Sequence, residues 1–248
     1  MKKTRQLNFL MTGTGSDGAD QNPFLVALAN DLPGVSVFQK KKAMGTLDGN
    51  YASVRRQLGA AVKANNTSRV VLVGHSEGGV HAMRLAKLPY VDLAVVCATA
   101  IGTFREIMLY QHECRPPVPC TIRAMLNSKP WSHPAETPGT RDRKAIRDWL
   151  TAVGWPTTDE FVNYNTSLLR YNGAELIRDA PGHKLVFVYA KHDMNVPMDL
   201  SVSNIQRVDT SIRVKQISAY DHNFRTKKRK QISRTALRQI VAVIRPNN

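Results

Sequence analysis

One stretch of the chain, residues 69–81, constrains the fold more than any other. It starts with a continuous apolar run at residues 70–73, continues as Gly-His-Ser-Glu-Gly at residues 74–78, and then carries apolar residues at helical spacing. This pattern predicts a buried strand, a turn tight enough to need small residues, and a helix. A strand that passes directly into a covering helix favours an α/β architecture.

Ser76 lies at the centre of this turn, in the pattern G-x-S-x-G. Between a strand and a helix, such a serine exposes its hydroxyl, while Gly74 and Gly78 allow close backbone approach. The N–H of Glu77 begins the helix and is placed to donate a hydrogen bond to an oxyanion. Ser76 is therefore a candidate nucleophile, and Glu77 is interpreted as a favourable charge at a helix N-terminus. The alternative is a glycine-rich turn whose serine only caps the helix.

Length and composition indicate a folded globular protein. The 248 residues, 42% hydrophobic and 22% charged, suffice for one domain with a substantial core. No apolar run approaches the roughly 20 residues of a membrane span, and the first apolar run is too short for a signal peptide. Cys97, Cys114 and Cys120 cannot all pair, which favours a reducing compartment and a cytoplasmic location. The spacing of Cys114 and Cys120 near His112 matches no zinc pattern, so no metal site is predicted.

Expected strands and helices alternate along most of the chain. Strands are expected at 7–12, 35–38, 70–73, 93–98, 184–190 and 211–218, and helices at 23–32, 51–64, after residue 78, at 198–207 and at 227–244. This alternation predicts a mainly parallel sheet of about six strands. The strands are continuous apolar runs rather than alternating ones, so helices are expected on both faces of the sheet; the strand at 211–218 alternates and is expected to be less buried.

Residues 101–182 interrupt the alternation. They contain many prolines, all three tryptophans and an amphipathic segment at 141–153, but no clear strand. We interpret them as a helical cap or lid insertion, which leaves residues 1–100 and 183–248 as the α/β core. The alternative is a set of surface helices that make no substrate contact.

Three chemically suited residues follow three expected strands. The carboxyl ends of parallel strands meet at one sheet edge, so Ser76, Asp193 and His222 are expected to lie together. A serine hydroxyl needs a base, a histidine can act as one near neutral pH, and a carboxylate orients the imidazole. The neighbouring Asp221 is the alternative acid, but it is too close in sequence to reach the same ring. Of the other histidines, His81 is expected on a helix surface.

The order Ser, Asp, His and the residues around it resemble the α/β-hydrolase superfamily, in particular its serine esterases and lipases. The resemblance is carried by residues 71–79, 190–197 and 221–224. It implies an α/β-hydrolase fold in which Ser76 is the nucleophile, Asp193 the acid and His222 the base. It implies no cofactor and no metal ion.

The resemblance also implies an oxyanion loop after the first core strand. That loop usually reads His-Gly in the family, whereas residues 12–15 here read Thr-Gly-Thr-Gly. The N–H of Thr14 is the favoured donor beside that of Glu77, and the N–H of Gly15 is the second choice.

The implied activity is hydrolysis of a carboxylic ester or thioester through an acyl-enzyme, carboxylesterase or lipase-like. Esters, thioesters and amides share this machinery, so the substrate stays open, as does the oligomeric state. The alternatives are an acyltransferase, or a non-catalytic protein of the same fold that binds an anionic partner.

The net charge of +16 and a pI near 10.1 are the unusual totals. Such a charge raises the local concentration of anionic partners. The basic clusters are Lys40, Lys41 and Lys42, and Arg225, Lys227, Lys228, Arg229 and Lys230. They are interpreted either as a surface for an anionic substrate or lipid, or as an ordinary solvated face. No nucleic-acid-binding motif is present, so nucleic acid is not an expected partner.

Overall fold

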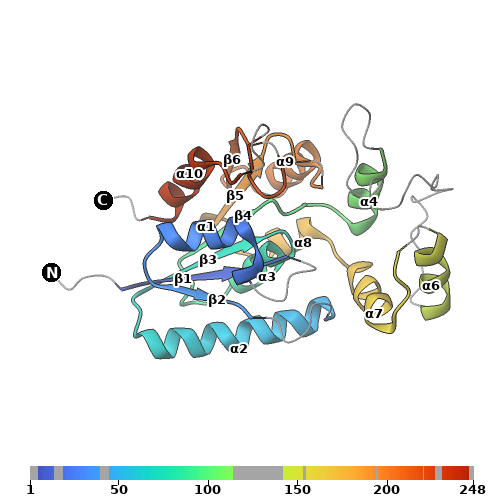
Figure 1. Cartoon of the computed structure of the whole chain (residues 1–248), viewed down its shortest axis with the longest axis horizontal. Helices are drawn as coiled ribbons and strands as arrows, with labels where there is room; N and C mark the ends of the chain where they lie inside the picture. The colour runs from blue at the N-terminus through green and yellow to red at the C-terminus, as the bar shows by residue number, and fades with distance from the viewer. Residues whose placement is uncertain are drawn as a thin grey trace.

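A six-stranded parallel sheet forms the centre of the molecule (Figure 1). The computed structural model describes residues 5–13, 19–39, 45–113, 142–152, 155–193, 195–219, 221–226 and 231–245. Its strands are β1 (Gln6–Met11), β2 (Val35–Val37), β3 (Arg69–His75), β4 (Leu93–Cys97), β5 (Leu185–Ala190) and β6 (Arg213–Ile217). They pair in the order β2-β1-β3-β4-β5-β6, and every pair is parallel. The predicted six-stranded α/β sheet is confirmed.

Helices connect the strands in the described ranges. They are α1 (Pro23–Asp31), α2 (Leu47–Asn65), α3 (Glu77–Leu85), α4 (Phe104–Glu113), α6 (Arg143–Ala152), α7 (Asp159–Leu168), α8 (Gly173–Arg178), α9 (Met198–Val208) and α10 (Arg234–Ile244), with short 3₁₀ turns η1 (Ala19–Gln21) and η2 (Gly182–Lys184). No helix among them is both long and apolar enough to cross a bilayer.

The sheet has an apolar layer on each face. Because strand side chains alternate, Phe9 and Phe187 pack on one face with residues of α2, α3, α8 and α9. Leu10 and Val188 pack on the other face with residues of α1 and α10. Both layers are almost fully buried, which explains why the central strands are apolar at nearly every position.

The last helix starts later than predicted. α10 begins at Arg234, where the Ser233 hydroxyl accepts a hydrogen bond from the Ala236 N–H at 3.2 Å. The expected start at Lys227 is therefore wrong for residues 231–233, because an N-cap serine sets the helix boundary. Residues 227–230 lie outside the described residues, as do Lys40, Lys41 and Lys42.

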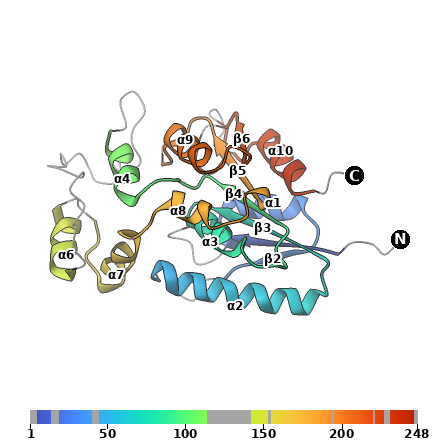
Figure 2. The same ribbon diagram turned by 180° about the vertical axis from the view of Figure 1, so that it is seen from behind.

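Part of the expected insertion has an apolar cluster of its own. Helices α4, α6 and α7 contribute Phe104, Ile146, Trp149, Leu150 and Val162, here called the insertion cluster. Figures 1 and 2 place these helices at the end of the molecule opposite the two termini. In contrast, α8 contributes Ile177 to the apolar layer that contains Phe9 and Phe187. The division into core and cap stays a prediction.

Candidate active site

The turn between β3 and α3 holds Ser76 in a strained conformation. Ser76 has φ 57° and ψ −123°, a region that costs a non-glycine residue about 1–3 kcal/mol. Three hydrogen bonds hold it: its N–H donates to the Cys97 carbonyl at 2.9 Å, and its own carbonyl accepts from the Thr99 hydroxyl at 2.8 Å and from the Gly79 N–H at 3.0 Å. The Ser76 side chain makes no capping hydrogen bond to α3. The alternative in which this serine only caps the helix is therefore wrong.

Glycines let the backbone close around this turn. A Cβ on Gly78 would lie 2.2 Å from the Met11 carbonyl oxygen, which no side chain tolerates. A Cβ on Gly13 would lie 2.6 Å from the Ser76 Cβ and 3.0 Å from its Oγ. The loop after β1 therefore passes directly against the Ser76 side chain. The expected donors Thr14 and Gly15 follow in this loop but lie outside the described residues.

Asp193 and His222 form a hydrogen-bonded pair. The Nδ1–H of His222 donates to Asp193 Oδ2 at 2.8 Å. The other carboxylate oxygen, Oδ1, accepts from the backbone N–H groups of Asn195 at 2.8 Å and Val196 at 3.2 Å. The Asp193 side chain is fully buried and that of His222 is 17% exposed. The carboxylate is thus fixed from both sides and orients the imidazole.

The surroundings of His222 favour its protonated form. Burial by itself lowers its pKa, but the charge and hydrogen bond of Asp193, with a further contribution from Asp221, raise the pKa above the usual 6.5. A base in this position gains the affinity for a proton that attack by a serine requires.

His75, directly before Ser76, braces the loop that carries His222. Its Nε2–H donates to the His222 carbonyl oxygen at 2.8 Å, and its Nδ1 accepts from Asn22 Nδ2 at 3.2 Å. The two imidazole rings lie 4.8 Å apart. Burial, and to a smaller extent the charge of the nearby His222, lowers the pKa of His75 to about 3. The His75 ring therefore stays neutral and keeps one tautomer. Sequence reasoning missed this role, because the partners lie far from residue 75 in the chain.

The structure brings the predicted residues to one edge of the sheet, but not into one hydrogen-bonded chain. The described residues include no hydrogen bond between the Ser76 hydroxyl and the His222 ring. Such catalytic hydrogen bonds are often long until substrate binds. The alternative acid, Asp221, instead binds the Nε–H of Arg225 at 2.6 Å. Arg225 is thereby ion-paired within the loop.

The side chains of α3 beyond Ser76 differ from the expectation. His81 is fully buried, so its expected place on the helix surface is wrong. The Nε2 atom of His81 lies 3.3 Å from the Glu77 carboxylate. The Tyr51 ring lies 6.4 Å from the His81 imidazole. Glu77 is buried too, rather than lying as an exposed charge at the helix end.

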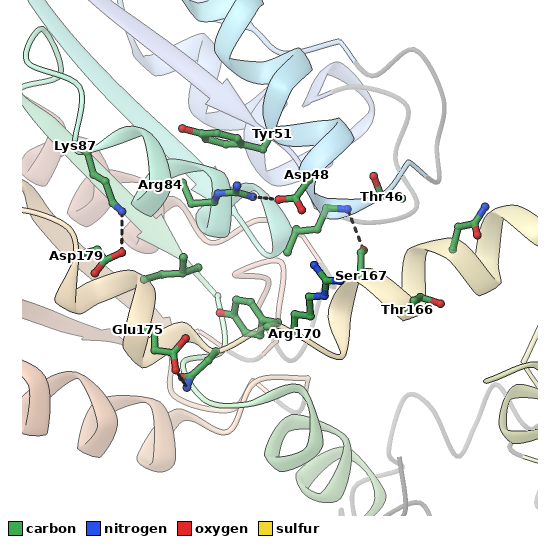
Figure 3. A pocket seen from close by; sticks show the side chains of 15 residues that line it. Thr46, Asp48, Tyr51, Arg84, Lys87, Thr166, Ser167, Arg170, Glu175 and Asp179 are labelled. Carbon is green, nitrogen blue, oxygen red and sulfur yellow. Dashed lines mark hydrogen bonds and ion pairs between the residues drawn. The ribbon is translucent and has the colours of Figure 1, made fainter. Parts of the chain in front are cut away.

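A cavity of about 670 Å³ lies between α2, α3, α7 and α8 (Figure 3). Its lining contains as many acidic as basic side chains, and Arg84 pairs with Asp48 at 2.8 Å while Lys87 pairs with Asp179 at 3.0 Å. Arg84 also lies over the Tyr51 ring, 3.8 Å from its centroid. Neither Ser76 nor the Asp193–His222 pair lines this cavity, so it is not the site at the strand ends.

Sheet order, strand direction and the turn at Ser76 together define the α/β-hydrolase fold. Solved structures agree. Est1E from Butyrivibrio proteoclasticus superposes with a TM-score of 0.59 at 13% identity, over 97% of this chain and 88% of that one. A lipase-esterase related protein from Clostridium acetobutylicum gives 0.58 at 14% identity, over 98% and 96% of the two chains. Naproxen esterase from Bacillus subtilis gives 0.57 at 14% identity, over 99% and 85%.

These superpositions show the fold that the chain shares with esterases, and at such low identity the activity has to be argued from the site. No family model and no curated protein sequence matches the chain.

Proposed function

We propose that the protein is a serine hydrolase that cleaves a carboxylic ester or thioester through an acyl-enzyme. Ser76 is the proposed nucleophile, His222 the general base and Asp193 the acid that orients it. The observation that carries the proposal is the 2.8 Å Asp193–His222 hydrogen bond at the sheet edge where Ser76 occupies a strained, partly exposed turn.

The proposed reaction has two halves. His222 takes the Ser76 hydroxyl proton as Oγ attacks the carbonyl carbon, and the negative charge that develops on the carbonyl oxygen is stabilised by backbone N–H groups. The N–H of Glu77 is one proposed donor, and the loop after Gly13 supplies the other, with Thr14 favoured over Gly15. The protonated His222 then gives its proton to the leaving alcohol or thiol. Water, deprotonated by His222, releases the acid and restores Ser76.

The structural neighbours support a small ester as the substrate class, since three of them are described as esterases or lipase-esterase related. The basic clusters at 40–42 and 225–230 are proposed to attract an anionic substrate or lipid surface. Of these residues the structure describes Arg225, whose ion pair with Asp221 already engages its charge.

A fluorophosphonate probe and short-chain p-nitrophenyl esters test the proposal. The wild type is expected to label and to turn over, and Ser76→Ala to lose labelling and about 10⁴-fold or more in kcat. Absence of both labelling and turnover in the wild type, over all acyl lengths, would falsify the hydrolase and favour a binding protein. Turnover that accelerates with an added alcohol, with transfer of the acyl group to it, would instead identify an acyltransferase.

A further inference from the structure

Glu77 places a carboxylate inside the protein, one residue after the proposed nucleophile. Its side chain is 4% exposed. It accepts hydrogen bonds from Asn50 Nδ2 on α2 at 2.9 Å and from the Tyr164 hydroxyl on α7 at 2.9 Å. His81 Nε2, one turn further along α3, lies 3.3 Å away. Side chains from three helices therefore meet at this carboxylate.

A charge at a helix N-terminus does not need such an environment. Exposed, it interacts favourably with the helix dipole at little cost, whereas a buried carboxylate costs several kcal/mol unless hydrogen bonds replace its water. The arrangement around Glu77 supplies those hydrogen bonds. Its effect is to fix the first residue of α3, and with it the peptide N–H proposed to hold the oxyanion.

Tyr164 links this carboxylate to the insertion. It belongs to α7, whose Val162 packs in the insertion cluster. A second polar contact joins α7 to the core, since the Leu47 N–H at the start of α2 donates to the Ser167 hydroxyl at 3.0 Å. One face of α7 thus packs within the insertion, while Tyr164 hydrogen-bonds to the residue that follows the proposed nucleophile.

We propose that Glu77 and Tyr164 are positioning residues, which together align the Glu77 N–H with the developing oxyanion. The reaction rate then depends on the position of α7 relative to the start of α3. This inference rests on the proposed hydrolase function. Neither side chain touches the reacting atoms; both act through the backbone of residue 77. The expected signature is therefore a loss in kcat with little change in KM.

Conservative variants test this inference. Tyr164→Phe removes one hydroxyl, and Glu77→Gln keeps the shape of the side chain without the charge. The double variant completes a double-mutant cycle, which measures the coupling between the two residues. Tyr171→Phe is the matched control, because its buried hydroxyl donates to the Ala100 carbonyl and does not contact Glu77. For each, kcat and KM are measured on p-nitrophenyl butyrate, together with inhibition by butylboronic acid, which forms a tetrahedral adduct on the serine. Thermal unfolding is recorded in parallel.

Complete removal of an oxyanion donor lowers kcat about 10²–10³-fold, so misalignment is expected to cost roughly tenfold. Tyr164→Phe and Glu77→Gln should each lose about this factor in kcat and in boronate affinity, with KM changed less than about twofold. The double variant should be no slower than Glu77→Gln, and Tyr171→Phe should keep wild-type kcat even where its melting temperature falls.

Unchanged kcat and boronate affinity in Tyr164→Phe would overturn the inference, whether or not Glu77→Gln folds. Equal kcat losses in Tyr164→Phe and Tyr171→Phe would overturn it as well, because they would indicate a general loss of stability. A wild type that neither turns over the ester nor labels with fluorophosphonate would refute the hydrolase proposal itself, and this inference with it.

Discussion

The α/β core and the insertion cluster are built differently. Strands of the core are joined by parallel hydrogen-bonded ladders and enclosed by two apolar layers, so the inner strands β1, β3, β4 and β5 are fixed by neighbours on both sides. The insertion cluster is a small apolar core, and the partly buried Trp155 packs against it with its ring 5.9 Å from that of Trp149. Polar contacts from Tyr164 and Ser167 join its helix α7 to the core.

The difference separates two tasks. The proposed catalytic groups, Ser76, Asp193 and His222, follow strands of the parallel sheet. The helices of the insertion cluster pack on one another, and α7 also contacts the core through Tyr164 and Ser167. We expect substrate preference to depend on the insertion cluster and the bond-making chemistry on the core, with the Tyr164–Glu77 hydrogen bond as the contact through which α7 affects the rate.

The largest expected effect concerns the core. Asp193→Asn keeps the shape of the side chain but cannot hold the His222 tautomer in the same way, so kcat should fall about 10⁴-fold while folding is retained. Steady-state kinetics and circular dichroism measure the two quantities. Asp221→Asn is the control and should stay within about threefold of wild type, since its carboxylate serves Arg225. Equal losses in the two variants would show that the acid has been misassigned.

A second pair of variants compares the two apolar regions directly. Phe187→Ala empties the centre of the sheet layer and should lower the free energy of unfolding by about 3–5 kcal/mol. Trp149→Ala removes a larger side chain from the insertion cluster but should change global unfolding by only about 1 kcal/mol, while hydrogen exchange in α6 and α7 accelerates. Denaturant titration and hydrogen-exchange mass spectrometry give these values. A global loss in Trp149→Ala as large as in Phe187→Ala would mean that the regions unfold together.

The smallest effect is a shift in pH dependence. In the proposed reaction His222 must be neutral to accept the serine proton, so its raised pKa should place the acidic limb of kcat/KM above pH 6.5. In Asp193→Asn the charge that raises this pKa is lost, so the limb should move to lower pH. Trp149→Ala should leave the limb where it is. The pH–rate profiles of the wild type, Asp193→Asn and Trp149→Ala measure the position of the limb. A limb that moves in Trp149→Ala would contradict the separation of core and insertion.

The parallel sheet and the helices that cover it could be predicted from the sequence. Runs such as residues 70–73 and 185–190 are apolar throughout because both sides of each strand are covered, and helical patterns stand between them. The predicted start of α10 is too early, because the Ser233 hydroxyl caps the helix N-terminus and the helix begins at Arg234. The positions of Ser76, Asp193 and His222 could be predicted for a related reason: each follows a strand, and parallel strands end at one edge.

Other contacts between distant segments could not be predicted. Nothing local marks His75 as the residue that hydrogen-bonds to the backbone of the His222 loop. The burial of His81 and Glu77 arises from α2 and α7, whose positions against α3 depend on the whole fold. Local patterns reveal which elements form, whereas the environment of a side chain depends on the elements that pack over it.

The place of β6 has a consequence for synthesis of the protein. β6 is the last strand along the chain and lies at the sheet edge, paired only with β5 among the described strands, and His222 follows it by five residues. During translation, Ser76 leaves the ribosome long before its proposed base. On the proposed mechanism, Ser76 in the nascent chain would have no base until β6 has docked. Acyl transfer would begin only when nearly all of the sheet is in place, so that catalytic activity would itself report the completion of folding.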